Sequence, residues 1–591
     1  MRNYYMLDID LSNGKSEKKD VSDLFNRYIG GTGVATALLD QFNPATDPYD
    51  PSAPVIFATG PFSSVFPVAT KTVAMFKSPL NGNMGESHAG GRLAMAMYGA
   101  GYHVIRIRGK AAFTCTLEIE GDNVRINSAS SLKGMSALAV ERVLRDHYKS
   151  DFKRSIVRIG PAGERLSPIA AATVDSSRHF GRLGLGGVLG SKNVKAIVIS
   201  GGNYWKIDSI GAFNTYYTKL YKAVVESDQM KKYHDLGTPI NVIPLSKING
   251  LPTRNFSQGY FENAEGISGE TFAERHLSQQ IACAHCQCGC IHMATLRESF
   301  NEAEHMYKTF KVSYDHELIF AWGSNLSIGD SEDVLRLLYY VEKQGWDAIS
   351  MGVILAWAVE AFQKGLINTT HTDGIVLNFG DAATYKKILE RISHRHNEFY
   401  TDLEKGSVFC AEKYGGKDFA IAFGKNEAPG YMTGLHSFLG YGTGVRHSHL
   451  DSAGYSIDQK KINSSKTDTD WTKEMYKEAV WRMALNSLVI CLFARNIYTP
   501  AVVSEGLKLL GMEHFDEAAI NKAARMIHAL KIRQKMNFGF KFSDLYLPAR
   551  LEKAVTTCGH VTQAQFDEQV KVYQALAEED LKLLNHGTEA L

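Results

Sequence analysis

The sequence lacks any long hydrophobic run. Its longest apolar stretches, such as SLVICLFA at 487–494, are far shorter than the ~20 residues that a membrane-spanning helix needs, so we expect no membrane span. The first residues, MRNYYMLDIDLSNGK, contain neither the apolar stretch nor the small-residue cleavage site of a signal peptide. We therefore expect a cytoplasmic protein, in which disulfides are rare.

The chain also lacks an excess of charge of either sign. Its 65 Lys and Arg residues against 63 Asp and Glu residues give a formal net charge of +2, which gives no reason to expect nucleic acid as a partner. There is no repeat of fixed period and no low-complexity tract. The hydrophobic content of 44% and the length of 591 residues predict a large globular core and three or four domain-sized units.

Cysteine is scarce but concentrated. The chain has eight cysteines, and Cys283, Cys286, Cys288 and Cys290 fall within eight consecutive positions of the segment IACAHCQCGCIH. Cysteines two positions apart seldom satisfy disulfide geometry, and the expected compartment also disfavours disulfides. The cluster therefore indicates a metal site.

The spacing favours iron–sulfur over zinc. Without Cys288 the run reads Cys-x-x-Cys-x-x-x-Cys, and a four-iron cluster commonly takes such a compact triplet plus one distant cysteine, for which Cys491 is the candidate. Structural zinc sites usually pair two ligand dyads a dozen or more residues apart. No second dyad is present, although His285 or His292 could complete a zinc site. Spacing alone leaves open whether Cys286 or Cys288 is the second ligand.

Residues 1–205 are predicted to be rich in β-structure. YYMLDID and KSEKKDV form a predicted hairpin around the turn SNGK, and several short β-branched runs follow, bounded by Gly, Pro or Asn. Between them lie three glycine-dense segments, which we predict to be loops: RYIGGTG, SPLNGNMGESHAGG and HFGRLGLGGVLGSKN. So many glycines beside one sheet suggest a large ligand that the backbone approaches closely. The pattern GLGGVLG lacks the spacing of a dinucleotide-binding motif.

From residue 206 onwards, apolar residues recur at helical spacing. The predicted fold is therefore α+β: a β-rich domain over 1–205, followed by mainly helical domains over 206–410 and 411–591.

Several segments together resemble one family, the tungsten-dependent aldehyde ferredoxin oxidoreductases. The resemblance runs over essentially the whole chain, and the order and spacing of the segments carry it. The matching segments are VIFATGPF, KSPLNGNMGESHAGG, GYHVIRIRGKA, GRLGLGGVLGSKNVKAI, CAHCQCGC, YDHELIFAWGSN, QGWDAIS, RHSHL and NSLVIC.

The resemblance implies a tungsten or molybdenum ion held by two pterin dithiolenes, with a [4Fe–4S] cluster close by. The β-rich domain would form the base under the pterins, and Mg²⁺ could bridge their phosphates. The cluster ligands would be Cys283, Cys286, Cys290 and Cys491, with Cys288 left over. The implied cofactor-binding residues are Lys71, His88, Gly90, Arg178, His179, Gly181, Arg182, Glu342, Trp346, Asp347, Asn486 and Ile490.

The chain departs from the family pattern at four of its positions. Glu342 and Asn486 stand where the family has the aspartates that accept hydrogen bonds from the pterins. Both keep an acceptor, but Asn486 loses the charge. His88 stands where an asparagine beside the magnesium is usual, and Asp451 where a basic residue is usual. These departures indicate a divergent member, whose substrate need not be that of the best-known members.

Two residues match the family's catalytic pair. Glu317, in YDHELIF, matches the active-site glutamate, and His449, in RHSHL, matches the active-site histidine. A carboxylate in a largely apolar pocket has a raised pKa and can shuttle protons near neutral pH. Asp315, His316 and His447 are near neighbours that could share this work.

We therefore predict an enzyme that oxidises an aldehyde to a carboxylic acid, with electrons leaving through the iron–sulfur cluster to ferredoxin or a ferredoxin-like partner subunit. A homodimer or a larger redox complex is the implied assembly. Two alternatives remain. One is the catalytic subunit of a tungsten-dependent benzoyl-coenzyme A reductase, and the other is a non-catalytic electron-transfer or scaffold protein that kept the fold.

Overall fold

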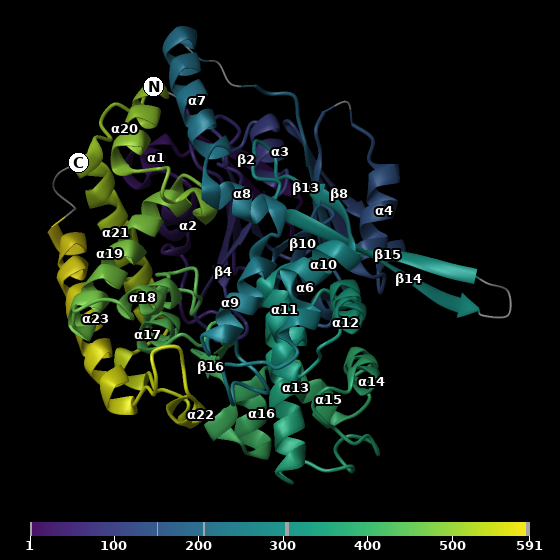
Figure 1. The fold of residues 1–591 in the computed structure, drawn as a ribbon. Coiled ribbons are helices and arrows are strands. Elements are labelled where there is room, and N and C mark those ends of the chain that lie inside the picture. Colours follow the sequence, from purple (N-terminus) through teal and green to yellow (C-terminus); the bar gives the residue numbers. More distant parts are fainter. Residues whose placement is uncertain (1–2, 151, 205–206, 208, 302–305, 587–591) are drawn as a thin grey trace.

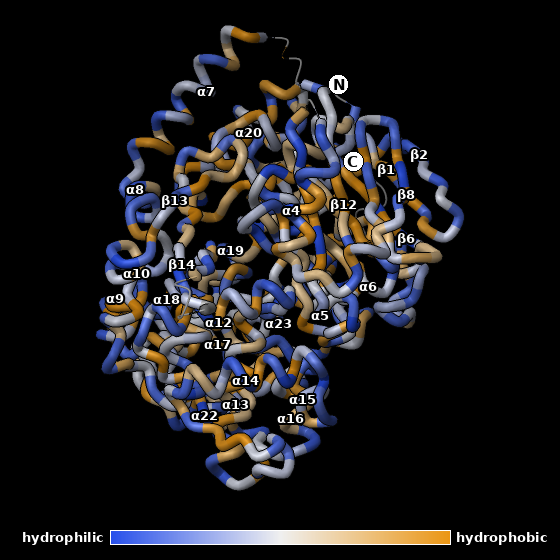
Figure 2. The backbone as a smooth tube through the Cα atoms, turned by 90° about the vertical axis from the view of Figure 1, so that its right-hand side faces the viewer, coloured by the Kyte–Doolittle hydropathy of each residue, from blue (hydrophilic) through white to orange (hydrophobic). Residues whose placement is uncertain are grey.

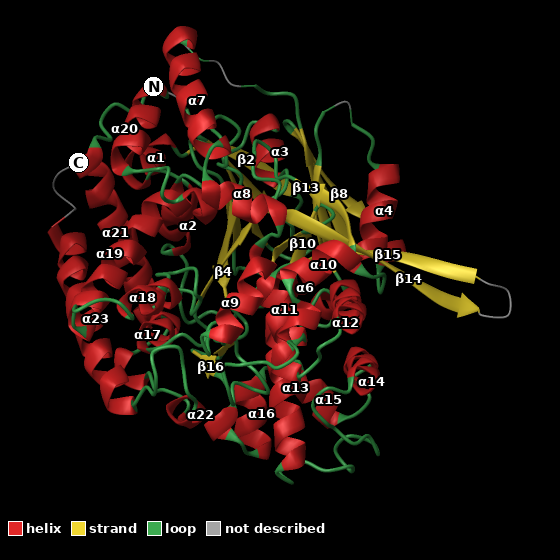
Figure 3. Cartoon of the chain, in the orientation of Figure 1, coloured by secondary structure: helices red, strands yellow, loops and turns green. Residues whose placement is uncertain are grey.

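The computed structural model describes residues 3–150, 152–204, 207, 209–301 and 306–586. Most of the strands gather in one part of the molecule, and helices make up most of the rest (Figure 3). The predicted α+β fold, with a β-rich first part followed by mainly helical chain, is confirmed. None of the helices in these ranges combines the length and the apolar composition that a membrane span requires.

Two six-stranded sheets form the β-rich part. The first has the order β2-β1-β6-β3-β4-β5 and the second the order β11-β10-β9-β12-β7-β8. In each sheet one neighbouring pair, β1 with β6 and β12 with β7, is parallel, and the other pairs are antiparallel. The strands are β1 (Tyr5–Asp10), β2 (Lys15–Asp20), β3 (Val55–Ala58), β4 (Thr72–Lys77), β5 (Met84–Ala89), β6 (Val104–Arg108), β7 (Cys115–Glu120), β8 (Asn123–Ser128), β9 (Ser155–Ile159), β10 (Ala172–Val174), β11 (Arg178–Phe180) and β12 (Val194–Ser200).

The two sheets share one hydrophobic core. Alternate residues of the first sheet, such as Phe57 and Ile105, join Leu117 and Ile197 of the second in one buried cluster. Side chains from the opposite face of the first sheet, such as Ile56, enter a second core together with the helices. Hydrophobic stretches accordingly run along β1, β6 and β12, whereas the exposed edge strand β2 is hydrophilic (Figure 2). Apart from the edge strand β2, the first sheet is thus buried on both faces.

The predicted hairpin is confirmed, because β1 pairs with β2 in antiparallel register. The prediction that the three glycine-dense segments are loops is wrong in part. Each contains regular structure: α2 begins at Gly31, β5 spans Met84–Ala89, and α6 spans Leu185–Ser191. In α6 the glycines let the helix approach backbone closely, since a Cβ at Gly190 would collide with the carbonyl of Gly163. Close packing explains glycines such as Gly190, whereas Gly82, with φ +71° and no atom within 4 Å of a Cβ, serves a turn.

The second half of the chain is mainly helical. The helices of the chain are α1 (Ser22–Tyr28), α2 (Gly31–Leu39), α3 (Leu93–Gly99), α4 (Ala137–His147), α5 (Pro161–Glu164), α6 (Leu185–Ser191), α7 (Ile210–Val225), α8 (Asp228–Asp235), α9 (Val242–Lys247), α10 (Gly269–Arg275), α11 (His316–Trp322), α12 (Ser331–Gln344), α13 (Ala348–Gln363), α14 (Ala382–Ser393), α15 (Glu398–Leu403), α16 (Ser407–Tyr414), α17 (Leu435–Thr443), α18 (Gly454–Lys461), α19 (Asp468–Ser487), α20 (Pro500–Leu509), α21 (Glu517–Asn537), α22 (Ala549–Lys553) and α23 (Gln563–His586). Gly345, with φ +74°, separates α12 from α13 within the long periodic run.

A three-stranded antiparallel sheet interrupts this helical region, and helical periodicity did not predict it. It consists of β13 (Leu277–Ile281), β14 (Ile291–Asn301) and β15 (Met306–Tyr314). The hairpin of β14 and β15 projects from the body (Figure 1). The cysteine run lies in the connection between β13 and β14. The sheet therefore fixes both ends of the cysteine loop.

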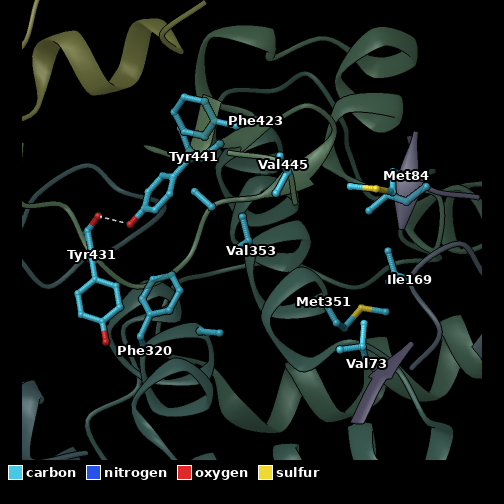
Figure 4. Close-up of a cluster of buried hydrophobic side chains, with 14 of the residues drawn as sticks. Val73, Met84, Ile169, Phe320, Met351, Val353, Phe423, Tyr431, Tyr441 and Val445 are labelled. Atoms are coloured by element: carbon cyan, nitrogen blue, oxygen red, sulfur yellow. Dashed lines mark hydrogen bonds between the residues drawn. The ribbon is translucent and has the colours of Figure 1, made fainter. Parts of the chain in front are cut away.

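One large core joins the β-rich part to the helices. Val73 and Met84 of the first sheet, Phe320 and Met351 of α11 and α13, and Tyr441 of α17 belong to the same buried cluster (Figure 4). Because the core is continuous, the parts are expected to hold one relative placement.

The C-terminal end of α19 packs backbone-to-backbone against the β-rich part. A Cβ at Gly60 would lie 2.8 Å from Cα of Leu488, and one at Gly31 would lie 2.5 Å from the carbonyl oxygen of Asn486. Real Cβ atoms do not approach backbone this closely, so only glycine fits at either position without a shift of the chain.

We predict that Gly60→Ala destabilises the protein by about 1–3 kcal/mol, because the methyl group must displace backbone that cannot move away easily. The matched control is Gly211→Ala in α7, where a Cβ would meet no atom within 4 Å and alanine is the better helix former. Thermal unfolding should show a lower Tm for the first variant and an unchanged or higher Tm for the second. An unchanged Tm for Gly60→Ala would contradict the close packing.

Candidate active site

A cavity of about 630 Å³ lies where the β-rich part meets the helices. Its lining comes from strands β5 and β11, the cysteine loop, helices α8, α11 and α18, the turn between α12 and α13, and the residues after α17 and α19. Every residue that the sequence analysis assigned to the metal, the cofactor or catalysis lines this cavity. The fold thus brings together predicted residues that lie up to 420 positions apart, from Lys71 to Cys491. Their roles remain predictions.

Backbone hydrogen bonds tie Cys491 to the cysteine loop. The N–H of Cys491 donates to the carbonyl of Val68 at 3.0 Å, and the N–H of Val68 donates to the carbonyl of His285 at 2.9 Å. A third bond, from the N–H of Ala284 to the carbonyl of Gly91 at 2.9 Å, holds the loop from the other side. Cys491 and the triplet of Cys283, Cys286 and Cys290 therefore face one region of the cavity although they come from distant segments.

Cys288 is directed away from this region. Its side chain is buried in the large core, its Sγ lies 3.5 Å from the carbonyl oxygen of Met230, and it does not line the cavity. It also hydrogen-bonds Cys290, and this bond lowers the pKa of Cys290 to about 6. Within the described ranges, no three His, Cys, Asp or Glu side chains are arranged as ligands of a single metal ion.

Lys71 and Gly90 border the cysteine region. Burial would lower the pKa of Lys71, but the neighbouring thiols of Cys491 and Cys283 raise it above its ordinary value. A Cβ at Gly90 would lie 2.6 Å from Sγ of Cys283 and 3.5 Å from Nζ of Lys71. At Gly181, by contrast, a Cβ would meet only the Cβ of His179, at 4.0 Å. Gly90 is therefore needed for packing, whereas Gly181 leaves space open to the cavity.

Several buried polar atoms at the cavity make no hydrogen bond with any described residue. Arg182 donates to Asp347, Ser350 and the carbonyl of Glu427, yet its Nη1 remains without a partner. The same holds for Nη2 of Arg446 and Nδ2 of Asn486. An unpaired buried donor costs about 1–3 kcal/mol. Donors of this kind around a cavity fit a ligand that carries phosphates and hydrogen-bond acceptors.

The neighbourhood of Glu342 contains its own counter-charge. Nε2 of His179 lies 3.3 Å from Oε1 of Glu342. Burial would raise the pKa of Glu342, but His179, Arg158 and Arg178 lower it below its ordinary value. Glu342 is thus an anion that can accept hydrogen bonds at the cavity wall.

Glu317 and His449 form a close pair. Glu317 lies in the first turn of α11, where Asp315 caps the helix. Its Oε2 accepts a hydrogen bond of 2.9 Å from the N–H of Gly430, and its Oε1 lies 3.5 Å from Nδ1 of His449, without hydrogen-bond geometry. The two side chains are 14% and 13% exposed.

Burial sets the protonation of this pair. It raises the pKa of Glu317 to about 8 and lowers the pKa of His449 to about 3. Near neutral pH, Glu317 is therefore a carboxylic acid and His449 a neutral imidazole. Glu317 can therefore donate a proton or a hydrogen bond, and His449 can accept a hydrogen bond, while neither side chain carries a charge.

Of the near neighbours, the structure places two at the cavity and one elsewhere. Asp315 and His316 line it. His447 does not, because its Nδ1 lies 2.9 Å from the carbonyl oxygen of Tyr441 and its ring packs against Gly424.

Sequence reasoning missed several residues of the site. Glu86 lies 2.7 Å from Nε2 of His88 and forms a buried ion pair with Lys531 of α21. Burial would raise the pKa of Glu86, but Lys531 lowers it well below its ordinary value. The alternation along β5 could have paired Glu86 with His88, but no local signal links them to Lys531, 445 positions away. Arg446 was missed too, although its salt bridge to Asp451 (2.6 Å) balances one of the noted departures.

An aromatic residue was missed as well. The ring of Tyr431 stacks on Tyr455 with centroids 4.2 Å apart, and it lies 5.3 Å from the ring of His449. The hydroxyl of Tyr441 donates to the carbonyl of Tyr431 at 3.0 Å and fixes the segment (Figure 4).

Comparison with known proteins gives matches over almost the whole chain. Residues 6–201 match the family description "Aldehyde ferredoxin oxidoreductase, N-terminal domain", and residues 215–578 match "Aldehyde ferredoxin oxidoreductase, domains 2 & 3".

Individual relatives agree with these matches. The tungsten-containing aldehyde ferredoxin oxidoreductase of Pyrococcus horikoshii is 31% identical over 453 residues, which cover 75% of this chain and 72% of that protein. The aliphatic sulfonate oxidoreductase, WOR-like subunit, of Pyrococcus furiosus is 26% identical over 560 residues, or 89% and 85% of the two chains. A chain in the solved active-site complex BamBC of benzoyl coenzyme A reductase, in complex with 1,5-dienoyl-CoA, has a TM-score of 0.82 at 19% identity. That alignment covers 100% of this chain and 98% of the other, and at this identity it shows a common fold.

We predict that Glu317→Gln stabilises the folded protein relative to wild type as the pH rises from 5 to 8. With a folded pKa of about 8 against about 4.3 in an unfolded chain, the folded wild type binds more protons over this range, so its stability falls with rising pH. Glutamine does not titrate. Thermal unfolding at pH 5, 6.5 and 8 should show a growing difference in Tm between the variant and wild type. A difference that stays constant would contradict the raised pKa.

Proposed function

Because the chain belongs to the aldehyde ferredoxin oxidoreductase family, we propose that it is an oxidoreductase that oxidises an aldehyde to a carboxylate at a tungsten or molybdenum bis-pterin centre. Aldehyde and water give carboxylate, three protons and two electrons. The electrons go to ferredoxin or a ferredoxin-like subunit. The observation that carries the proposal is the proton-holding pair of Glu317 and His449, which shares one cavity with four cysteines and unpaired cationic donors.

The lining fits the proposed cofactor. Arg182, Arg446 and Asn486 each have a buried donor atom that lacks a partner in the described chain, and such donors suit phosphates and pterin acceptors. Glu342 would accept hydrogen bonds from pterin amines. The bound cofactor would supply a Lewis acid and a sink for two electrons. His88 would lie beside Mg²⁺ if that ion bridges the pterin phosphates.

The four cysteines fit a [4Fe–4S] cluster. Three come from one short loop and the fourth from the segment after α19, and backbone hydrogen bonds through Val68 connect the two segments. Bound there, a cluster would supply one-electron transfer. Lys71, which the thiols surround, would balance part of the negative charge of the thiolates.

Glu317 and His449 would handle the protons. Since Oε2 of Glu317 accepts the N–H of Gly430, the proton of the neutral acid is best held at Oε1, the oxygen that faces His449. Nδ1 of His449, 3.5 Å away, would accept a hydrogen bond from that proton once the two side chains align, and Nε2–H would be left to donate to an oxygen of the substrate. Burial keeps water away from this pair and preserves the raised pKa of Glu317.

A second reaction remains a candidate, and the activity measurements described below distinguish it from aldehyde oxidation. The structural similarity to the benzoyl coenzyme A reductase complex keeps the reduction of an aromatic thioester as the second candidate. Two relatives are described as a subunit or a complex, which supports our proposal that this chain acts in a homodimer or a larger redox complex.

We predict that anaerobically purified protein contains tungsten or molybdenum together with iron, and reduces a viologen dye when an aldehyde is added. Glu317→Gln should keep the metals and lose at least about 99% of turnover, since general acid–base groups contribute about 10²–10⁴-fold. Elemental analysis and dye reduction are the measurements. Reduction of an aromatic thioester by a strong donor, without aldehyde activity, would favour the second candidate. Iron without tungsten or molybdenum would contradict both candidates and favour the non-catalytic alternative.

We predict that Cys491→Ser loses the paramagnetic signal of the reduced four-iron cluster and part of its iron. Cys288→Ser is the matched control, because Cys288 lies in the same cysteine-rich neighbourhood but does not line the cavity. It should keep both the signal and the iron content of wild type. Electron paramagnetic resonance and iron analysis are the measurements. If Cys288→Ser lost the signal and Cys491→Ser kept it, Cys288 and not Cys491 would be the cluster ligand.

A further inference from the structure

We propose that the surface beside the cysteine loop is a docking site for an acidic electron-transfer protein. This surface, here called the basic face, consists of Arg92, Arg145, Lys153 and Arg154 around the exposed His285. The proposal rests on the proposed function, because it assigns the exit for the electrons that aldehyde oxidation releases.

Only a thin layer of protein separates the cysteines from solvent at this point. Ala282 and His285 are exposed, whereas Cys283 between them is buried at 9% exposure. The loop is fixed in place, since Ala284 donates to Gly91 and Cys286 donates to Cys283 through backbone hydrogen bonds. Electron transfer falls steeply with distance, so a partner gains most by approaching over this loop.

Four cations from three segments meet beside the loop. Arg92 follows β5, Arg145 lies near the end of α4, and Lys153 and Arg154 precede β9. Arg145 and Arg92 both lie close enough to act electrostatically on Arg154, and Lys153 does the same to His285. The side chains of Arg92 and Arg145 are 41% and 35% exposed. The basic face is therefore continuous with the loop.

Three described carboxylates lie near these four cations. Asp175 lies 3.7 Å from Arg92, and Glu141 pairs with Arg145 and Arg158, but both carboxylates are buried at 9% side-chain exposure. Asp146 is an exposed carboxylate among the residues that act on Arg154. Among the described residues, Lys153 and Arg154 have no carboxylate within ion-pair distance. Lys153 and Arg154 are thus the two cations of the basic face whose positive charge no salt bridge between described residues compensates.

Charge complementarity identifies the occupant. A face with exposed cations steers and orients an acidic protein, and it repels a basic one. The partner we infer is an acidic ferredoxin, or a ferredoxin-like subunit with an acidic surface, and each docking event passes one electron to its oxidised iron–sulfur cluster. Two such events match the two electrons released per aldehyde.

The test measures how tightly an acidic bacterial ferredoxin with two [4Fe–4S] clusters binds, by calorimetry at low salt. The purified full-length protein is compared with the double variant Lys153→Glu/Arg154→Glu. We expect the double variant to bind about tenfold or more weakly, and the difference to shrink at high salt, where exposed charges are screened. Reduction of benzyl viologen, a small dication, should be unchanged or faster in the variant. Lys153→Glu alone serves as a second variant should the double variant fold poorly, because Lys153 is exposed and makes no hydrogen bond or ion pair with a described residue.

The matched control is Lys508→Glu/Lys571→Glu, which changes the net charge equally at exposed residues of α20 and α23, far from α4 in Figure 1. Ferredoxin should bind this control as it binds wild type. Equal weakening in both double variants, or none in either, would overturn the proposal and indicate non-specific attraction or another docking site. If aldehyde does not drive viologen reduction in wild type, the proposed function fails, while ferredoxin affinity still decides whether the basic face docks such a partner.

Discussion

The arrangement of the site depends on one backbone contact, the packing of the end of α19 against glycines of the β-rich part. At Gly30, Gly31 and Gly60 a Cβ would collide with the backbone of residues 486–488. This contact places Asn486 and Ile490 at the cavity wall. It also lets the N–H of Cys491 donate a hydrogen bond to the carbonyl of Val68. A looser contact would separate the fourth cysteine from the other three. The fold therefore uses glycine here to bring two segments of the chain together, and Gly30 and Gly31 also adopt positive φ values of +157° and +29°.

Burial acts to raise the pKa of both Glu86 and Glu317, and their neighbours decide the outcome. Glu86 is surrounded by cations, and Lys531 holds its pKa well below the ordinary value. Glu317 accepts a backbone N–H and forms no salt bridge with a lysine or arginine of the described chain, so burial raises its pKa to about 8. The first carboxylate is a fixed charge beside His88 and Lys531, and the second is the group that we propose to carry protons. Two acids in one cavity thus differ in role because their neighbours differ.

Local patterns in the sequence predicted the hairpin of β1 and β2, the α+β order, and a set of site residues that the fold does gather at one cavity. They failed where contact with another segment of the chain determines the local structure. β5 forms because β4 pairs with it, and its glycines suggested a loop. The sheet of β13–β15 was hidden by the helical periodicity around it. Lys531 could not be linked to Glu86 from 445 positions away, since only tertiary packing brings α21 to β5.

The departures from the family pattern come with neighbours in this chain that compensate for them. Glu342 lies 3.3 Å from His179, and Asp451 forms a short salt bridge with Arg446, so neither carboxylate is an unpaired buried charge. Unpaired buried charges are strongly destabilising, whereas paired ones are tolerated. Asn486, which lacks the charge of an aspartate, needs no such counter-ion and keeps an unpaired Nδ2 for a ligand. The substitutions therefore change how the cavity distributes charge and leave polar groups at its wall that suit a polar cofactor, which is consistent with the proposed enzyme and gives no support to the non-catalytic alternative.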